Sequence, residues 1–211
     1  MQSTQQLNVD LSSHFNNPGI ASSCHRAVDG LDGTGTVFCA ASLPPSRAVI
    51  DCNGTQFVFP DKCDGIEDNI ACEGQEIPLP VGAYSHLHFL GMSDWRAFEE
   101  PILLKYSDGT CVEKTLGLSD ASHYKGLLFK ESEAIVCRLV SPDSLIPHIH
   151  LFNISPPADD YQMKEAYLEA GIWHQVIPAE APRLLAGIVL PDNPSMHLFA
   201  LTLITVDEAS L

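Results

Sequence analysis

Basic residues are scarce in this sequence. Lys and Arg total 11 against 27 Asp and Glu, which gives a formal net charge of −16. A field of that sign repels phosphate backbones and anionic lipid headgroups. The chain also lacks an apolar run of about 18 residues, the length that a membrane-spanning helix needs. We therefore expect neither a nucleic acid nor a membrane as the partner.

Several catalytic and cofactor motifs are missing as well. The sequence has no G-x-S-x-G nucleophile elbow, no glycine-rich phosphate loop after a strand, and no C-x-x-C pair. These gaps argue against a serine hydrolase of that type, a nucleotide-binding loop, and a zinc or thioredoxin-type site. No cofactor and no catalytic metal are predicted.

Short apolar runs punctuated by Gly, Pro, Asn and Asp are what the sequence does contain. This pattern is typical of an antiparallel sandwich or barrel, and 211 residues suit one large β domain. We predict a single all-β domain over 1–211, an antiparallel β-sandwich. The expected strands are 7–11, 47–52, 55–60, 84–91, 101–107, 110–118, 134–140, 148–154, 165–177, 183–190 and 196–206.

Three local patterns refine this expectation. Asp108-Gly109 predicts a hairpin with a two-residue turn, in which both positions have positive φ. Residues 196–206 are apolar on both faces, as in a central strand covered on both sides. Residues 165–177 fit an amphipathic helix or a strand, and the period-two alternation favours the strand. The segments 9–20 and 189–203, which bracket the chain, are expected to be structural.

Seven cysteines and two N-glycosylation sequons, at Asn53 and Asn153, favour an oxidising secretory history. Because the sequence begins with a polar segment, a signal peptide is expected to have been removed ahead of Met1. Connectivity does not follow from spacing alone. The preferred disulfides are Cys24–Cys39, Cys63–Cys72 and Cys111–Cys137, with Cys52 left over.

The sequence leaves two possible metal sites to consider. The H-x-H pair of His86 and His88 places both imidazoles on one face of a strand, but we expect that face to be solvated, without a metal. Asp29 and Asp32 lie in a glycine-rich turn that either holds a structural Ca²⁺ or adopts this composition for backbone reasons alone.

Large rings outside the clearest apolar runs are candidates for ligand contact, because aromatic faces suit sugars and flat conjugated ligands alike. Trp173 is equally compatible with the core. The candidates are Trp95, Phe98, Tyr124, Tyr167 and Trp173.

A family resemblance rests on six segments, VDLSSHFNNPGI, DGLDGTG, QEIPLPVGAYSHLHFLG, ILLKYSDGT, LGLSD and LPDNPSMHLFALTL. They resemble the galactose-binding-like, lectin-like jelly-roll modules that accompany glycoside hydrolases, and the likeness covers about four-fifths of the chain. As a standalone protein, the chain resembles fungal hetero-Diels–Alderases of secondary metabolism. Those enzymes join a tropolone-derived ortho-quinone methide to a polyene sesquiterpene such as humulene.

That resemblance implies a pericyclase that needs no cofactor. Trp95, Phe98, Tyr167 and Trp173 would contact the substrates, and Arg96 would hold the tropolone oxygens. His88 or His174 would transfer a proton, assisted by Tyr124. The alternatives are a non-catalytic carbohydrate-binding module, a secreted interaction protein, and a cupin-like metalloenzyme.

Overall fold

A computed structural model describes residues 5–22, 30–122, 126–141 and 166–206, and these form a β-sandwich, as predicted. The described part holds strands and two short 3-10 turns, Ser12–His14 and Ala40–Ser42. The strands are β1 Gln6–Val9, β2 Ile20–Ala21, β3 Val37–Cys39, β4 Val49–Cys52, β5 Thr55–Val58, β6 Ile70–Glu73, β7 Glu76–Ser93, β8 Phe98–Tyr106, β9 Cys111–Leu118, β10 Ser132–Ser141, β11 Ala166–Pro178, β12 Leu184–Val189 and β13 Asp192–Thr205.

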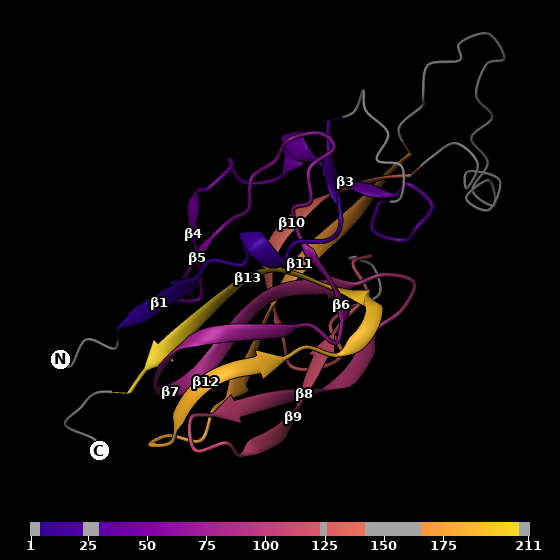
Figure 1. The fold of residues 1–211 in the computed structure, drawn as a ribbon. Coiled ribbons are helices and arrows are strands. Elements are labelled where there is room, and N and C mark those ends of the chain that lie inside the picture. Colours follow the sequence, from indigo (N-terminus) through magenta and orange to yellow (C-terminus); the bar gives the residue numbers. More distant parts are fainter. Residues whose placement is uncertain (1–4, 23–29, 123–125, 142–165, 207–211) are drawn as a thin grey trace, which may run out of the picture.

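The long strand β7 belongs to both layers of the sandwich (Figure 1). Its first half pairs with β12, which continues through β8 to β9. Its second half lies between β11 and β13, and β11 leads through β10 and β3 to β2. At the other side, β13 pairs with β1 and β6. The strand pairings are antiparallel except for β2 with β3.

The central strand β13 is buried on both faces, as its apolar sequence predicts. Every residue from Met196 to Leu203 is buried. Leu201 and Leu203 belong to the core between the two layers. Phe199 belongs to a second cluster, which the hairpin β4–β5 completes through Phe57 and Phe59. The hairpin thus covers part of the outer face of the larger layer.

Strand predictions hold where the apolar run is long and fail where it is short. Residues 166–178 form the strand β11, which decides the ambiguity between helix and strand. The strands β2, β3 and β6 were not predicted, because two to four residues are too few to show a period. The expected strand 148–154 lies outside the described residues.

The prediction of a two-residue turn at Asp108-Gly109 is wrong, although the hairpin exists. Tyr106 N donates to Thr110 O over 2.9 Å, which leaves three residues in the loop. Only Gly109 has positive φ there (82°), as in a type I turn followed by a left-handed residue. The two-residue turn occurs instead in β4–β5, where Asn53 and Gly54 have φ of 55° and 84°.

The predicted disulfides Cys63–Cys72 and Cys111–Cys137 are wrong, since all four thiols are free. Cys72 is fully buried in the core whereas Cys63 is exposed. Cys111 lies exposed on β9 and Cys137 is buried on β10, in the other layer. Cys39 is also free, and its expected partner Cys24 lies outside the described residues.

The structure bears only in part on the two glycosylation sequons and on the expected lack of a membrane span. Asn53 is exposed in the β4–β5 turn, so its glycosylation stays a prediction, and Asn153 lies outside the described residues. Within the described ranges, no helix has the length and hydropathy needed to cross a bilayer.

Thiol accessibility offers a direct check of the cysteine pattern. Iodoacetamide should alkylate Cys63 and Cys111 in the folded protein, because the thiolates there are accessible to the reagent. Cys72 and Cys137 should react only after denaturation, as peptide mass spectrometry would show. Recovery of a peptide in which Cys63 is disulfide-bonded to Cys72 would contradict this pattern.

Gly171 leaves room for the indole of Trp173, two residues along the same face of β11. A Cβ on Gly171 would lie 2.0 Å from Trp173 Cη2. Gly171→Ala should therefore lower the free energy of unfolding by about 1–3 kcal/mol, the usual range for overpacking a core. Urea denaturation measures this loss. In the Trp173→Leu background the same substitution should cost less, and an equal cost in both backgrounds would rule out the steric explanation.

Candidate functional site

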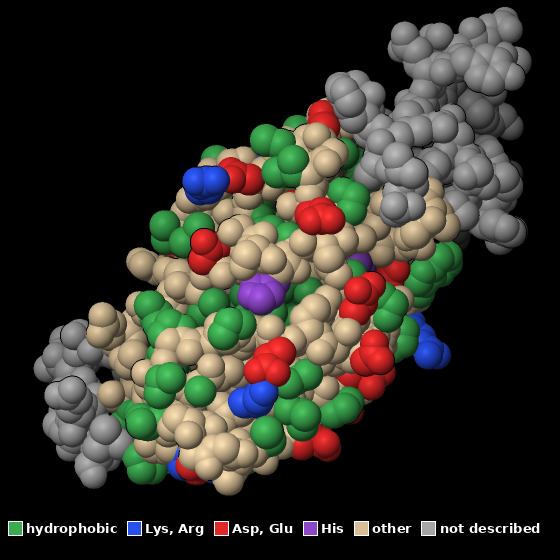
Figure 2. Space-filling view, viewed as in Figure 1, with side chains coloured by type: hydrophobic (Ala, Val, Ile, Leu, Met, Phe, Trp, Pro, Cys, Tyr) green, Lys and Arg blue, Asp and Glu red, His purple; other side chains and the backbone are tan. Residues whose placement is uncertain are grey.

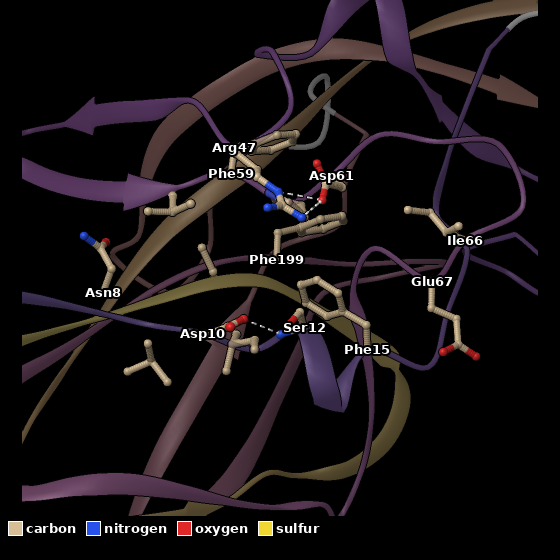
Figure 3. Close-up of a pocket in the computed structure, with 15 residues that line it drawn as sticks. Asn8, Asp10, Ser12, Phe15, Arg47, Phe59, Asp61, Ile66, Glu67 and Phe199 are labelled. Carbon is tan, nitrogen blue, oxygen red and sulfur yellow. Dashed lines mark hydrogen bonds and ion pairs between the residues drawn. The ribbon is translucent and has the colours of Figure 1, made fainter.

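A cavity of about 470 Å³ opens between β1, the β4–β5 hairpin and β13 (Figure 3). Its walls are mainly apolar, and three Phe rings come from three separate segments of the chain. Figure 2 shows exposed hydrophobic side chains on this face of the molecule, interspersed with acidic ones. The apolar lining includes Leu11, Phe15, Val58, Phe59, Ile66 and Phe199.

Charged groups lie on two sides of the cavity (Figure 3). On one side the Arg47 guanidinium binds one carboxylate oxygen of Asp61, with Nε at 2.7 Å and Nη2 at 2.6 Å. On the other side Asp10 accepts the backbone N–H of Ser12 over 2.9 Å. That bond is the main cause that lowers the pKa of Asp10, with a smaller contribution from Arg47. Glu67 also lines the cavity.

The backbone around Arg47 is held in a conformation that few residues with side chains adopt. Arg47 has φ of 56°, in the left-handed region. Its N–H donates to Phe59 O over 3.1 Å, and Ala48 N donates to Pro45 O over 3.1 Å. These bonds fasten the 45–48 turn to the end of the hairpin, beside the cavity.

A histidine pair lies under the same hairpin. His88 Nδ1 is 2.8 Å from His174 Nε2 and 3.1 Å from Thr55 Oγ1. Phe57 contacts the His174 ring edge-on, with the centroids 5.2 Å apart. The two candidate histidines are thus brought together, although β7 and β11 are far apart in sequence.

Burial controls the protonation of this pair. Desolvation, and then the neighbouring charges of His174 and His86, lower the pKa of His88 to about 4. Desolvation also lowers the pKa of His174, whose buried Nδ1 has no hydrogen-bond partner in the described part of the chain. The expectation that His86 and His88 both face solvent is therefore half right: His86 is exposed, but the hairpin covers part of His88.

A polar contact separates the cavity from the histidine pair. Thr202 lies opposite His88 on the neighbouring strand. Its Oγ1 is 2.7 Å from Gln56 O and 2.9 Å from Asn8 Oδ1, and Asn8 lines the cavity. The cavity and the histidines are therefore neighbours on one face of the sheet.

Trp173 is a core residue, which corrects its prediction as a substrate-stacking ring. Its side chain is 2 % exposed, and Nε1 donates to Ser119 O over 3.0 Å. On the same face of β11, Gln175 Nε2 donates to Gly117 O and Phe129 O. These two β11 side chains tie down the segment that follows β9, which leaves no room for a ligand against the indole.

The predicted cluster of Trp95, Arg96 and Phe98 lies at the end of β7, away from the cavity. The Trp95 ring is 62 % exposed, and the Arg96 guanidinium lies 4.7 Å from the centre of the Phe98 ring. Five strand residues, about 17 Å, separate the end of β7 from His88. Tyr124 lies outside the described residues, and Tyr167 is the second residue of β11.

In the turn where a calcium site is expected, the Asp32 carboxylate accepts hydrogen bonds from backbone N–H groups. Asp32 Oδ1 accepts the N–H groups of Thr34 and Thr36 over 2.9 and 3.2 Å. Asp29 lies outside the described residues, so the calcium site stays a prediction. Among the residues that the structure covers, no group of three or more His, Cys, Asp or Glu is arranged to hold a metal ion.

Residues 3–133 match the AziU2-like β-sandwich domain family, a span that includes more than half of the chain. The chain belongs to this family. The match contains every lining segment of the cavity except Phe199 and Ala200, which come from β13. No curated protein matches the chain. Membership in the AziU2-like family therefore agrees with the sandwich fold and leaves the reaction open.

Sequence reasoning missed the cavity, since none of the predicted catalytic or substrate-contacting residues lines it. One signal was present: the two bracketing segments supply Asp10, Phe15 and Phe199, and they meet because β1 pairs with β13. The expectation that these segments are structural stays a prediction, although both contribute residues to the lining of the cavity. No sequence motif relates Phe59 or Arg47 to the other residues that line the cavity.

The histidine pair predicts a loss of stability in acid. Because folding lowers the pKa of His88 and His174, the unfolded chain binds more protons below the ordinary histidine pKa, and stability falls as pH falls toward about 4. His197 titrates in the same sense, whereas Asp68 and Asp94, with pKa values raised to about 7 and 6, oppose it. A comparison of the natural protein with a His88 variant isolates the contribution of His88 to the pH dependence of stability.

His88→Gln should lose stability less steeply than the natural protein between pH 7 and 4.5, because Gln does not titrate. Denaturant unfolding at several pH values measures the two slopes. Two parallel profiles would show that His88 is not a source of the acid sensitivity.

Proposed function

We propose that this AziU2-like sandwich is a pericyclase whose cavity binds an apolar polyene beside a flat, oxygen-bearing ring. The reaction is a hetero-Diels–Alder addition of a polyene terpene to a tropolone ortho-quinone methide. The observation that carries the proposal is an apolar cavity that presents the partly buried Phe15 and the exposed Val58 and Ile66, with a guanidinium at one side. Its volume of about 470 Å³ falls within the usual range for small-molecule sites.

Cycloaddition suits a site of this composition. Two σ bonds form as π bonds are lost, so the step itself needs no nucleophile, proton donor or redox partner. The protein contributes by holding the two reactants in contact, and orientation alone can supply about 7–11 kcal/mol in well-aligned systems. Phe15 would contribute to that alignment, because an aromatic face packs flat against a conjugated ligand.

Formation of the quinone methide by loss of water would need proton transfer. His88 or His174 remains our proposal for that step. The two rings are hydrogen-bonded to each other, one strand away from the cavity, and neither is among the residues that line it. Their lowered pKa values keep both rings neutral near pH 7, so they would begin as a base and a neutral donor.

A secretory location remains part of the proposal. The Asn53 sequon is exposed at a turn, which is the placement that N-glycosylation requires. The free buried thiols of Cys72 and Cys137 do not depend on an oxidising compartment.

Carbohydrate binding is the second candidate, and the exposed Trp95 ring favours it. The residue has φ of 60°, and its side chain is 62 % exposed. An indole presented by a turn in this way can stack on a sugar ring. A glycan array distinguishes the two functions, because saturable glycan binding that is lost in Trp95→Ala would assign binding to this turn.

Incubation of the protein with a tropolone alcohol and humulene tests the pericyclase directly, with adduct measured by chromatography and mass spectrometry. Val58→Asp should lower the rate at least tenfold, because it places a charge in the apolar wall at a position that is 41 % exposed and tolerates the change.

Val49→Asp is the matched control. Val49 is the cross-strand partner of Val58, is 61 % exposed and does not line the cavity. The Val49→Asp variant should form the adduct at a rate near that of the natural protein. Equal adduct with and without protein would overturn the proposed function, and equal losses in the two variants would move the reaction away from this cavity.

A further inference from the structure

Arg47 is unusual in its surroundings. The protein carries an excess of 16 negative charges, and the cavity is lined by the carboxylates of Asp10, Asp61 and Glu67. Among the described residues that line it, Arg47 is the one with a basic side chain. The guanidinium is the strongest hydrogen-bond donor in this lining, so a ligand oxygen that carries partial negative charge would be bound there.

The geometry leaves donors available for such a ligand. Arg47 uses Nε and Nη2 on a single oxygen of Asp61, and a guanidinium has five N–H donors in a rigid fork. The side chain is 79 % exposed, so an incoming ligand can reach it. Figure 3 shows the guanidinium directed toward the cavity near Phe199, with Asp61 beside it and Asp10 across the cavity.

We propose that Arg47 binds the carbonyl or enolate oxygen of the ring substrate, and that Asp61 is a positioning residue that orients the guanidinium. This inference rests on the proposed function, whose ring substrate carries adjacent oxygens. Planar oxygen pairs match the guanidinium fork better than they match an ammonium group.

The charge distribution of the addition fits the two sides of the cavity. A C–C bond forms between the methide carbon and one alkene carbon, and a C–O bond forms between the heterodiene oxygen and the other alkene carbon. All atoms and electrons of both reactants remain in the adduct. As the C–C bond leads, negative charge grows on the oxygen and positive charge on the alkene.

The oxygen would then lie at Arg47, where electrostatic stabilisation grows with its charge. The alkene would lie toward Phe15 and Asp10, where an aromatic face and a carboxylate both favour a developing cation. The cavity thereby selects one orientation of the two reactants, and with it the regiochemistry of the adduct.

Binding of tropolone alone tests the Arg47 assignment without the reaction. Isothermal titration with ionised tropolone should give a Kd that rises at least tenfold in Arg47→Gln. Arg47→Lys should recover part of the affinity, because it keeps the charge but loses the fork. Asp61→Asn should weaken binding less than Arg47→Gln does.

Arg183→Gln serves as the matched control, since Arg183 also makes an ion pair and lies on an aromatic ring, with Glu180 and Tyr106. These residues belong to the β8–β12 side of the molecule. The tropolone affinity of Arg183→Gln should equal that of the natural protein. A loss of affinity as large as in Arg47→Gln would overturn the assignment of the oxygen site to Arg47.

Adduct formation then separates this inference from the proposed function. Arg47→Gln should lower kcat/KM for the addition about ten- to a hundredfold and should yield a less selective mixture of regioisomers. If Arg47→Gln matches the natural protein in affinity and rate while Val58→Asp loses activity, the Arg47 assignment fails and the pericyclase stands. If the natural protein forms no adduct but binds tropolone through Arg47, the function fails and the oxygen site stands.

Discussion

Burial of β13 on both faces is the constraint on which the rest of the structure depends. Eight successive residues, Met196 to Leu203, are buried, so the larger layer needs a cover on each side. The layer of β12, β8 and β9 provides one cover. On the other face the β4–β5 hairpin brings Phe57 and Phe59 onto the strand. The hairpin is short, and the cavity forms beside it, over the end of β1 and the neighbouring part of β13.

The same hairpin connects the features of the site. Its turn carries Asn53, the buried Thr55 that follows the turn contacts His88, and its last residues reach the cavity. Thr202 joins the hairpin to β1 through Gln56 and Asn8. A change in how the hairpin packs would therefore alter the histidine pair and the cavity together.

Much of the fold follows from the sequence because the signals are local. The doubly apolar run at 196–206 indicates a central strand, and alternation in 165–177 indicates β11. The site is different, because its parts are not local. Arg47, Phe59 and Phe199 meet only through strand pairing and through a turn that places Arg47 in the left-handed region. Trp173 shows the converse, because an aromatic residue that suggests ligand contact packs over Gly171 instead.

The central claim is that the ligand lies in the cavity between Arg47 and Asp10. A crystal structure of the protein with the tropolone–terpene adduct tests it most directly. The account predicts electron density for the adduct against Phe15 and Val58, with the tropolone oxygens within hydrogen-bond distance of the Arg47 guanidinium. Density for the adduct at the Trp95 turn, with the cavity filled only by water, would contradict it.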